Sequence, residues 1–287
     1  NILDKYFKYM KLKFIPKISI LKSILMILTG ISFFEMQEIY SSITILACSN
    51  TVPSKVPCII RASTYNVEIV KVDICKNNPF PNFRSTPDYG GSYCLNLYNI
   101  ESNPKIVNLA RNPTFKIPKD LKNKGEFNHI SVIFKNKFTV SGKYQSGEEI
   151  WITSNKGPKN PIKTSNSNDS PRAFTEKLSN WRGSNNIDNK YCDNDGGTSS
   201  RCDLNYNGNK LTAIGLDNDL VETSGNRVKY VFYNLELNPP ITLNSADEGF
   251  IDIKYKKNLE VYGNGKNIKT ISTAPLIFRA LYRKENL

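Results

Sequence analysis

Residues 64–75 read TYNVEIVKVDIC, and apolar side chains alternate with polar ones along this segment. The apolar positions fall first at Tyr65, Val67 and Ile69 and then, one residue out of step, at Val70, Val72 and Ile74. A period of two is typical of a β-strand with one buried face, and a change of phase within the run indicates a β-bulge. The segment therefore predicts a long strand with a bulge near its middle.

Residues 127–140, FNHISVIFKNKFTV, carry the longest alternation in the chain. One face holds Ile130, Val132, Phe134, Phe138 and Val140, and the other holds His129, Ser131, Lys135, Lys137 and Thr139. This pattern predicts a half-buried antiparallel strand. Further strands are expected at residues 93–100, 148–154, 211–216, 227–237, 250–261 and 267–272, with a hairpin tip at 262–265. We expect a mainly β protein with an antiparallel, sandwich-like fold.

One short helix is expected within this β fold, after a polar loop. Ser170 can cap it, Pro171 suits its first turn, and Phe174, Leu178 and Trp181 would share one face. Residues 155–169, rich in Asn, Ser and Pro, form the loop or linker. It either separates a β domain at 43–154 from a second region at 170–287, or joins two halves of one domain.

The N-terminal part resembles an export signal. Residues 10–34 carry four Lys, at positions 11, 13, 17 and 22, and end in an uncharged stretch, 23–34. That stretch is shorter than the roughly 18 to 20 residues of a membrane-spanning helix. We expect residues 1–42 to be upstream sequence and a signal peptide, with no stable transmembrane anchor. Cleavage follows either Ser41 and Ser42 or Ala47, where a weak lipobox precedes Cys48. The expected location is therefore secreted, periplasmic or at the cell surface.

Six cysteines follow Ser42, and an even number in an exported chain indicates disulfides. Neighbouring cysteines are separated by 10, 19 and 10 positions, which favours three local loops. The expected pairs are Cys75–Cys94, Cys192–Cys202 and Cys48–Cys58. A metal site would need C-x₂₋₄-C spacing, which the sequence lacks.

The chain has a formal net charge of +13, and about +10 remains once the first 42 residues are set aside. A basic protein is attracted to anionic polymers and cell surfaces. The Lys residues are spread singly and no nucleic-acid-binding motif is present, so specific nucleic-acid binding is not expected.

Signatures of catalysis are sparse, and no catalytic residue is predicted. His129 is the only histidine and falls on the polar face of its strand. The sequence therefore does not favour nucleophilic catalysis by a Ser-His or Cys-His pair, or a metal centre with several His ligands. The adjacent acids Glu148, Glu149, Asp247 and Glu248 leave a glycoside hydrolase open as a rival, because that chemistry needs only two carboxyl groups.

A group of oxygen-bearing side chains beside glycines offers the best ligand site for a cation. The candidate calcium ligands are Asp193, Asp195, Asp203, Asn205 and Asn207. Ca²⁺ takes several oxygen ligands from a tightly turning chain, but the carboxylate expected six residues after Gly208 is replaced by Ile214. The alternative is an Asn-Gly hairpin in which residues 202–206 pair with 210–214. No other cofactor is expected.

Residues 64–75 and 127–144 resemble uncharacterised exported β-rich proteins that open with T-Y-x-V-x-I-x-K-V-x-x-C, and the resemblance implies no function. The leading hypothesis is a non-catalytic extracellular protein acting in adhesion, assembly or surface structure, whose partner is an anionic polymer, a cell surface or the protein itself. The alternative is a carbohydrate-binding or carbohydrate-active protein that uses Trp151 as a stacking platform.

Overall fold

The computed structural model describes residues 47–284 apart from 53–56, 82–85, 100–104, 109–111, 118–124, 180–199, 207–208, 245–248, 256–258, 275 and 277. All of these residues belong to one compact unit, Ser42–Leu287. No helix in the described part of the chain is both long and apolar enough to cross a membrane.

Most of the described residues are in strands, as expected for a mainly β, sandwich-like protein. In chain order the strands are β1 (Cys58–Ile60), β2 (Ala62–Cys75), β3 (Cys94–Asn99), β4 (Lys105–Asn108), β5 (Thr114–Lys116), β6 (Gly125–Lys135), β7 (Phe138–Ser146), β8 (Glu149–Ile152), β9 (Ile162–Thr164), β10 (Phe174–Glu176), β11 (Arg201–Tyr206), β12 (Asn209–Leu216), β13 (Tyr230–Leu243), β14 (Gly249–Tyr255), β15 (Leu259–Asn264), β16 (Asn267–Thr273) and β17 (Phe278–Lys284).

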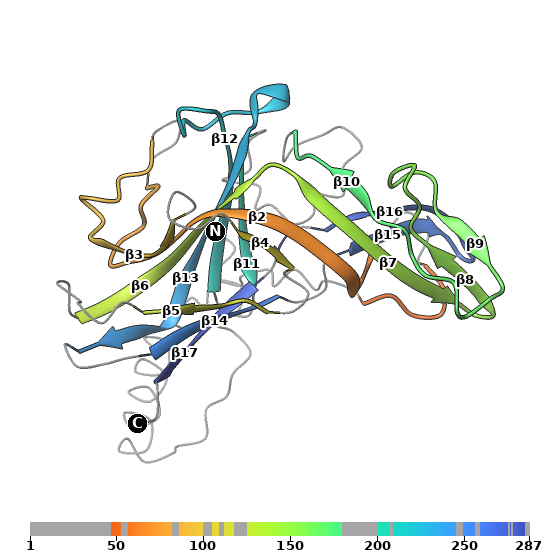
Figure 1. Cartoon of the computed structure of the whole chain (residues 1–287), viewed down its shortest axis with the longest axis horizontal. Coiled ribbons are helices and arrows are strands. Elements are labelled where there is room, and N and C mark those ends of the chain that lie inside the picture. The colour runs from red at the N-terminus through yellow and green to blue at the C-terminus, as the bar shows by residue number, and fades with distance from the viewer. Residues whose placement is uncertain are drawn as a thin grey trace, which may run out of the picture. The chain divides into compact units, whose positions relative to one another are not determined.

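The described strands form one 11-stranded sheet and two three-stranded sheets, and every pairing between strands is antiparallel. The large sheet runs β11-β12-β13-β6-β2-β7-β8-β9, with β3 and β4 on the other edge of β2 and β10 on β7. The long strand β2 pairs with β7 through its first half and with β6 through its second (Figure 1).

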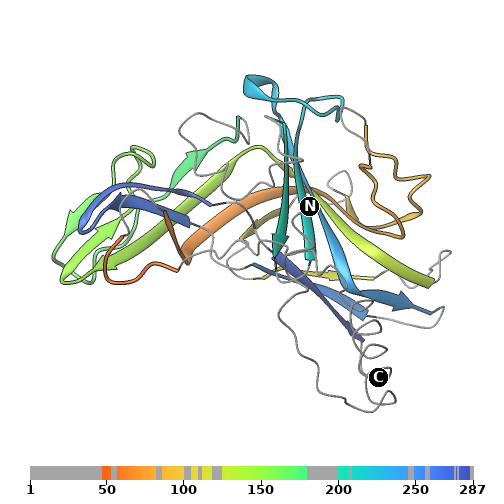
Figure 2. The ribbon, with the colours of Figure 1, turned by 180° about the vertical axis from the view of Figure 1, so that it is seen from behind.

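Each three-stranded sheet lies against a different half of the large sheet. Strands β1, β15 and β16 lie beside β7 and β8, whereas β5, β14 and β17 lie beside β6 and β13, as Figures 1 and 2 show from opposite sides. The main hydrophobic core runs through both halves and includes Tyr65, Phe134 and Leu259. The sandwich therefore has two parts. In each part a three-stranded sheet lies against one half of the large sheet, and β2 runs through both halves.

The bulge expected within residues 64–75 is confirmed. In the pairing of β2 with β6, Ile69 lies opposite Phe134 and Lys71 lies opposite Ile133, so Val70 is the additional residue. The main-core residues are Tyr65, Val67 and Ile69 before the bulge and Val72 and Ile74 after it, because the extra residue reverses the facing of the strand.

The alternation of residues 127–140 belongs to two strands and not to one. A break at Asn136 and Lys137 separates β6 from β7, although both follow the same edge of β2. Asn136 is buried in this break, where its side-chain Nδ2 donates to the carbonyls of Leu178 and Val228 and its Oδ1 accepts from the Leu178 N–H. These three hydrogen bonds, to Leu178 and Val228, satisfy the buried side chain of Asn136 at the position where the strand is interrupted.

The helix expected after Ser170 is wrong for its described residues. Phe174–Glu176 form the short strand β10, which pairs with β7. Phe174 is buried in the main core by this pairing, so tertiary contact satisfies the same apolar residue that suggested a helix. Trp181, the third residue of the expected helical face, lies outside the described residues.

Two of the expected disulfides, Cys48–Cys58 and Cys75–Cys94, are present. Cys202 is also disulfide-bonded, and its expected partner Cys192 lies outside the described residues. No described cysteine carries a free thiol. These bonds indicate an oxidising compartment. The expected hairpin at 202–214 is present as β11-β12, and β15-β16 form the second hairpin, whose turn lies at Gly265 and Lys266 because residues 262–264 belong to β15.

Candidate functional site

A basic pocket opens between the edge strands β9 and β16, at one end of the molecule's β7-β8-β9 region. It encloses about 690 Å³ and is lined by Ser154, Asn155, Lys156, Lys159, Asn160, Pro161, Ile162, Arg172, Ile268 and Lys269. Its residues come from the loop before β9, from the segment before β10 and from β16. Three separate parts of the chain therefore meet at this pocket.

Hydrogen bonds fix the loop that forms most of the pocket wall. The buried Ser154 hydroxyl donates to the Asn160 carbonyl at 2.6 Å, and Asn160 Nδ2 donates to the Lys156 carbonyl at 3.3 Å. The carbonyl of Pro158 accepts the Ile271 N–H at 3.0 Å, which ties the loop to β16. The loop is thus held by hydrogen bonds within itself and by one to β16.

Arg172 is positioned by its backbone. Its N–H donates to the Thr153 carbonyl at 2.9 Å, and its carbonyl accepts the Thr153 hydroxyl at 2.8 Å. Thr153 in turn accepts the Gly142 N–H at 3.1 Å. The backbone of Arg172 is therefore fixed against β7, while its side chain is exposed.

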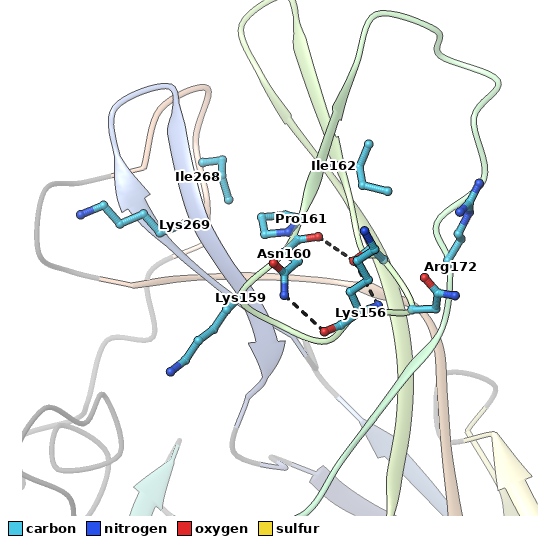
Figure 3. Close-up of a pocket in the computed structure, with 10 residues that line it drawn as sticks. Lys156, Lys159, Asn160, Pro161, Ile162, Arg172, Ile268 and Lys269 are labelled. Atoms are coloured by element: carbon cyan, nitrogen blue, oxygen red, sulfur yellow. Dashed lines mark hydrogen bonds between the residues drawn. The ribbon is translucent and has the colours of Figure 1, made fainter.

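The lining carries four cationic side chains, Lys156, Lys159, Arg172 and Lys269, and no acidic one among the described residues. All four are exposed, and none forms an ion pair with a described residue. Figure 3 shows the charged ends of Lys159, Arg172 and Lys269 pointing away from one another, around a floor that includes Pro161 and Ile268. This arrangement surrounds the pocket with positive charge and does not focus it on one point.

A second polar feature crosses the large sheet in the other half of the molecule. Six polar residues lie in register on six neighbouring strands, and we call them the polar row. From β3 to β11 the row consists of Asn96, Asp73, Ser131, Asn234, Thr212 and Asp203. All except Asn96 are buried. The row lies on the same face as a small apolar cluster of Phe80, Ile133, Ile214, Leu216 and Phe232.

Three side-chain atoms in the polar row lack hydrogen-bond partners among the described residues. They are the hydroxyl oxygen of Ser131, Oδ1 of Asn234 and Oδ2 of Asp73. Buried polar atoms are nearly always paired, so each of these atoms carries a cost in stability. At the β11 end of the row the carboxylate of Asp203 is hydrogen-bonded, because it accepts from Thr212 Oγ1 and from Arg201 Nε.

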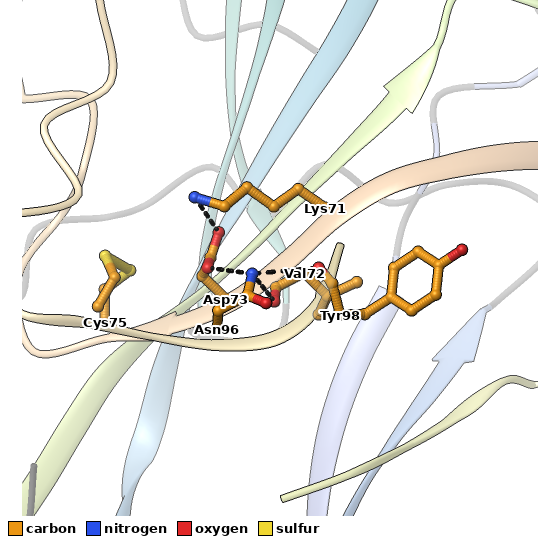
Figure 4. Close-up of polar contacts among 7 residues, drawn as sticks. Lys71, Val72, Asp73, Cys75, Asn96 and Tyr98 are labelled. Carbon is orange, nitrogen blue, oxygen red and sulfur yellow. Dashed lines mark hydrogen bonds and ion pairs between the residues drawn. A yellow bond between two sulfur atoms is a disulfide. The ribbon is translucent and has the colours of Figure 1, made fainter. Parts of the chain in front are cut away.

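At the β2-β3 end of the row, one carboxylate contacts two side-chain nitrogens (Figure 4). Asp73 Oδ1 accepts from Asn96 Nδ2 at 2.9 Å, and Asp73 Oδ2 lies 3.3 Å from Lys71 Nζ, as an ion pair without hydrogen-bond geometry. Lys71 Nζ also lies 3.3 Å from the centre of the Tyr89 ring. Burial raises the pKa of Asp73, although Lys71 and Asn96 oppose the shift.

His129 neighbours the polar row, and the contacts described for it are with Asn234 and Glu236. Its Nδ1 lies 3.3 Å from Asn234 Nδ2, and it faces Glu236 across the β6-β13 pairing. Burial lowers its pKa, with Glu236 acting in the opposite direction. The side chain is half-buried.

The calcium candidates are only partly within the described residues. Asp193, Asp195 and Asn207 lie outside them, and of Asn205 only the backbone, in β11, is described. Both carboxylate oxygens of Asp203 are engaged by protein donors. Among the described residues no group of three or more His, Cys, Asp or Glu side chains could hold a metal ion.

Of the residues considered for sugar chemistry, those that the structure describes lie in β8 or directly before it. Trp151 lies in β8, half-buried and packed against the main core, and its indole nitrogen is buried. Glu149 forms an ion pair with Lys163 at 2.7 Å, and the hydrogen bond from Lys163 is the main reason that its pKa is lowered. Glu148 is exposed, and Asp247 and Glu248 lie outside the described residues.

Sequence reasoning did not find the pocket cations or the polar row. Lys269 is far in sequence from Lys156, and only the packing of the 154–161 loop on β16 joins them. Asp73 did leave a signal, because it is a charged residue within an apolar strand. Comparison with models of protein families, with curated proteins and with solved structures finds no match to this chain.

Proposed function

We propose that this chain is an exported, non-catalytic surface protein that binds an anionic polymer at the basic pocket. The observation that carries the proposal is the set of four exposed cations around one hollow, with no acid among its described lining residues. Export is supported by the signal-like N-terminal sequence and by disulfides typical of oxidising compartments.

The spacing of the charged ends favours an extended ligand. A single small anion is best held by donors that converge on it, whereas Lys159, Arg172 and Lys269 diverge around the rim (Figure 3). A polymer with repeated negative groups can contact each cation in turn. The described lining contains no aromatic side chain, so the pocket lacks the stacking platform that a neutral sugar site would use.

Binding to dextran sulfate and to uncharged dextran of the same length tests the proposal. Both polymers have the same sugar backbone, so a difference between them reports the charge alone. We expect binding to dextran sulfate, a loss of affinity as salt rises, and no binding to dextran. Equal affinity for both polymers would refute the anionic site and favour the carbohydrate-binding alternative.

Matched variants locate the site. Replacing Lys156, Lys159, Arg172 and Lys269 together by Ala should reduce affinity for dextran sulfate at least about tenfold, because each partly exposed contact is worth several tenths of a kcal/mol. The control replaces three Lys and one Arg that are exposed outside the pocket: Lys137, Lys210, Lys229 and Arg227. Both variants lose four positive charges, so an equal loss of affinity in both would show that net charge and not the pocket binds the polymer.

Export has its own test. The protein recovered from outside its cell should lack the residues up to about Ser42, and mass spectrometry of its N-terminal peptide identifies the first residue. An N-terminal peptide from within residues 1–34 would contradict export by a cleaved signal.

A further inference from the structure

The contacts of Asp73 bring together a primary amine and a primary amide on neighbouring strands. Asp73 and Asn96 face each other directly in the β2-β3 pairing, and Lys71 lies two residues before Asp73 on the same face. The carboxylate contacts the amine nitrogen through Oδ2 and the amide nitrogen through Oδ1. Lys71 Nζ and the side-chain amide of Asn96 therefore contact the two oxygens of one carboxylate (Figure 4).

We propose that Lys71 and Asn96 form an intramolecular amide cross-link between β2 and β3, with Asp73 carrying the protons. This proposal does not depend on the proposed binding of an anionic polymer. The flexible four-carbon stem of Lys71 allows its nitrogen to move from Asp73 Oδ2 to the amide carbon.

The reaction balances without an oxidant, a reductant or a co-reactant. Asp73 takes a proton from the Lys71 ammonium, and the neutral amine attacks Cγ of Asn96 to form a new C–N bond. Asp73 returns that proton to Asn96 Nδ2, the C–Nδ2 bond breaks, and ammonia leaves. The lysine nitrogen keeps one hydrogen, as an amide N–H, and its remaining proton passes through Asp73 to solvent.

The surroundings favour the proton transfers. Asp73 is 2% exposed, and Lys71 Nζ rests on the ring of Tyr89, whose hydroxyl is itself buried. Burial disfavours the charged carboxylate of Asp73 and favours its neutral acid. The raised pKa of Asp73, caused mainly by burial, agrees with this direction.

The strands are also held in place for the reaction. The Cys75–Cys94 disulfide joins β2 to β3 only two residues from the Asp73–Asn96 pair. Asn96 Nδ2 is further fixed by the Tyr98 carbonyl at 3.1 Å. Holding two reacting groups in one geometry removes much of the entropic barrier to bond formation.

Mass spectrometry of the full chain tests the cross-link directly. After reduction, alkylation and digestion with trypsin, Lys71 in an amide is not cleaved, so residues 62–76 should appear joined to residues 85–105. This branched species should weigh about 17 Da less than its two parts because ammonia has left. Recovery of residues 62–71 and 85–105 as separate peptides of unmodified mass would overturn the proposal.

Two variants test the assigned roles. Lys71→Arg keeps the charge beside Asp73 but lacks a nucleophilic amine, and it should give separate peptides. Asp73→Asn keeps the shape of the acid but cannot accept the lysine proton, and it should also lose the branched species. A Cys75–Cys94 disulfide in the unreduced digest shows that the two strands still pair in each variant. A complete cross-link in Asp73→Asn would overturn the proton-carrying role of Asp73.

Discussion

Two buried serines in the large sheet should respond to the same substitution with opposite signs. Ser131 lies in β6 and is 1% exposed, and Ser146 lies in β7 and is fully buried. The Ser131 hydroxyl has no hydrogen-bond partner among the described residues, whereas the Ser146 hydroxyl donates to the Asn50 carbonyl at 2.9 Å. We predict that Ser131→Ala stabilises the fold and that Ser146→Ala destabilises it.

The magnitude follows from the difference between the two sites. Leaving a buried hydroxyl unpaired costs about 1 to 3 kcal/mol, and a made hydrogen bond contributes about 0.5 to 1.5 kcal/mol. Changes common to any Ser→Ala substitution in a strand, such as β-propensity, cancel when the two variants are compared. Because the two effects have opposite signs, the unfolding free energies of Ser131→Ala and Ser146→Ala should differ by about 3 kcal/mol, or about 6 to 12 °C in Tm for a chain of this size.

Urea denaturation of the wild type and both variants measures this difference, with the slopes checked for equality. If Ser131→Ala destabilises the fold as much as Ser146→Ala does, then the Ser131 hydroxyl is hydrogen-bonded in solution. The polar row would then carry no cost in stability at Ser131, contrary to this prediction.

Three further predictions concern packing and charge. Phe80→Ala should cost about 3 to 5 kcal/mol in a urea titration, because Phe80 is fully buried and its ring centre lies 5.2 Å from that of Phe232. Gly215→Ala should cost at least about 2 kcal/mol by the same measurement, because the added Cβ would lie 2.7 Å from the Thr223 carbonyl oxygen. Burial raises the pKa of Glu176, so the folded state binds its proton more tightly than the unfolded state does, and the stabilisation is present at low pH. As the pH rises from about 4 to about 7, the wild type should lose unfolding free energy relative to Glu176→Gln.

Local patterns predicted the parts of the fold that local sequence controls. The phase change at Val70 identified the bulge because a bulge moves every following side chain to the other face. The Asn-Gly and Gly-Asn-Gly segments identified two hairpins, and Gly265 has a φ of 62° in the second. Cysteine spacing identified two bonds because short loops are the easiest to close.

The helix after Ser170 failed because its signals were ambiguous. Phe174 and Leu178 are spaced as on a helical face, but Phe174 enters the core from β10 and Leu178 follows the strand, where its N–H donates to Asn136 Oδ1. These contacts with β7 and Asn136 join residues about 40 positions apart in the chain. A helical pattern of three apolar residues carries no information about such distant partners.

The polar row shows why the candidate sites required the structure. Ser131 falls on the face of its strand that reads as polar, and a half-buried strand would leave that face to solvent. In the structure the same face also carries Ile133, which packs with Phe80 and Phe232, so polar and apolar residues are buried side by side. The position of Asp73 opposite Ser131 and Asn96 depends on the register of β2 with two strands that follow it in the chain. That register is set by the bulge at Val70, because without the additional residue Lys71 and Asp73 would face the opposite side of the sheet. A feature visible in the sequence thus places the acid that contacts both Lys71 and Asn96, even though its two partners could not be paired from the sequence.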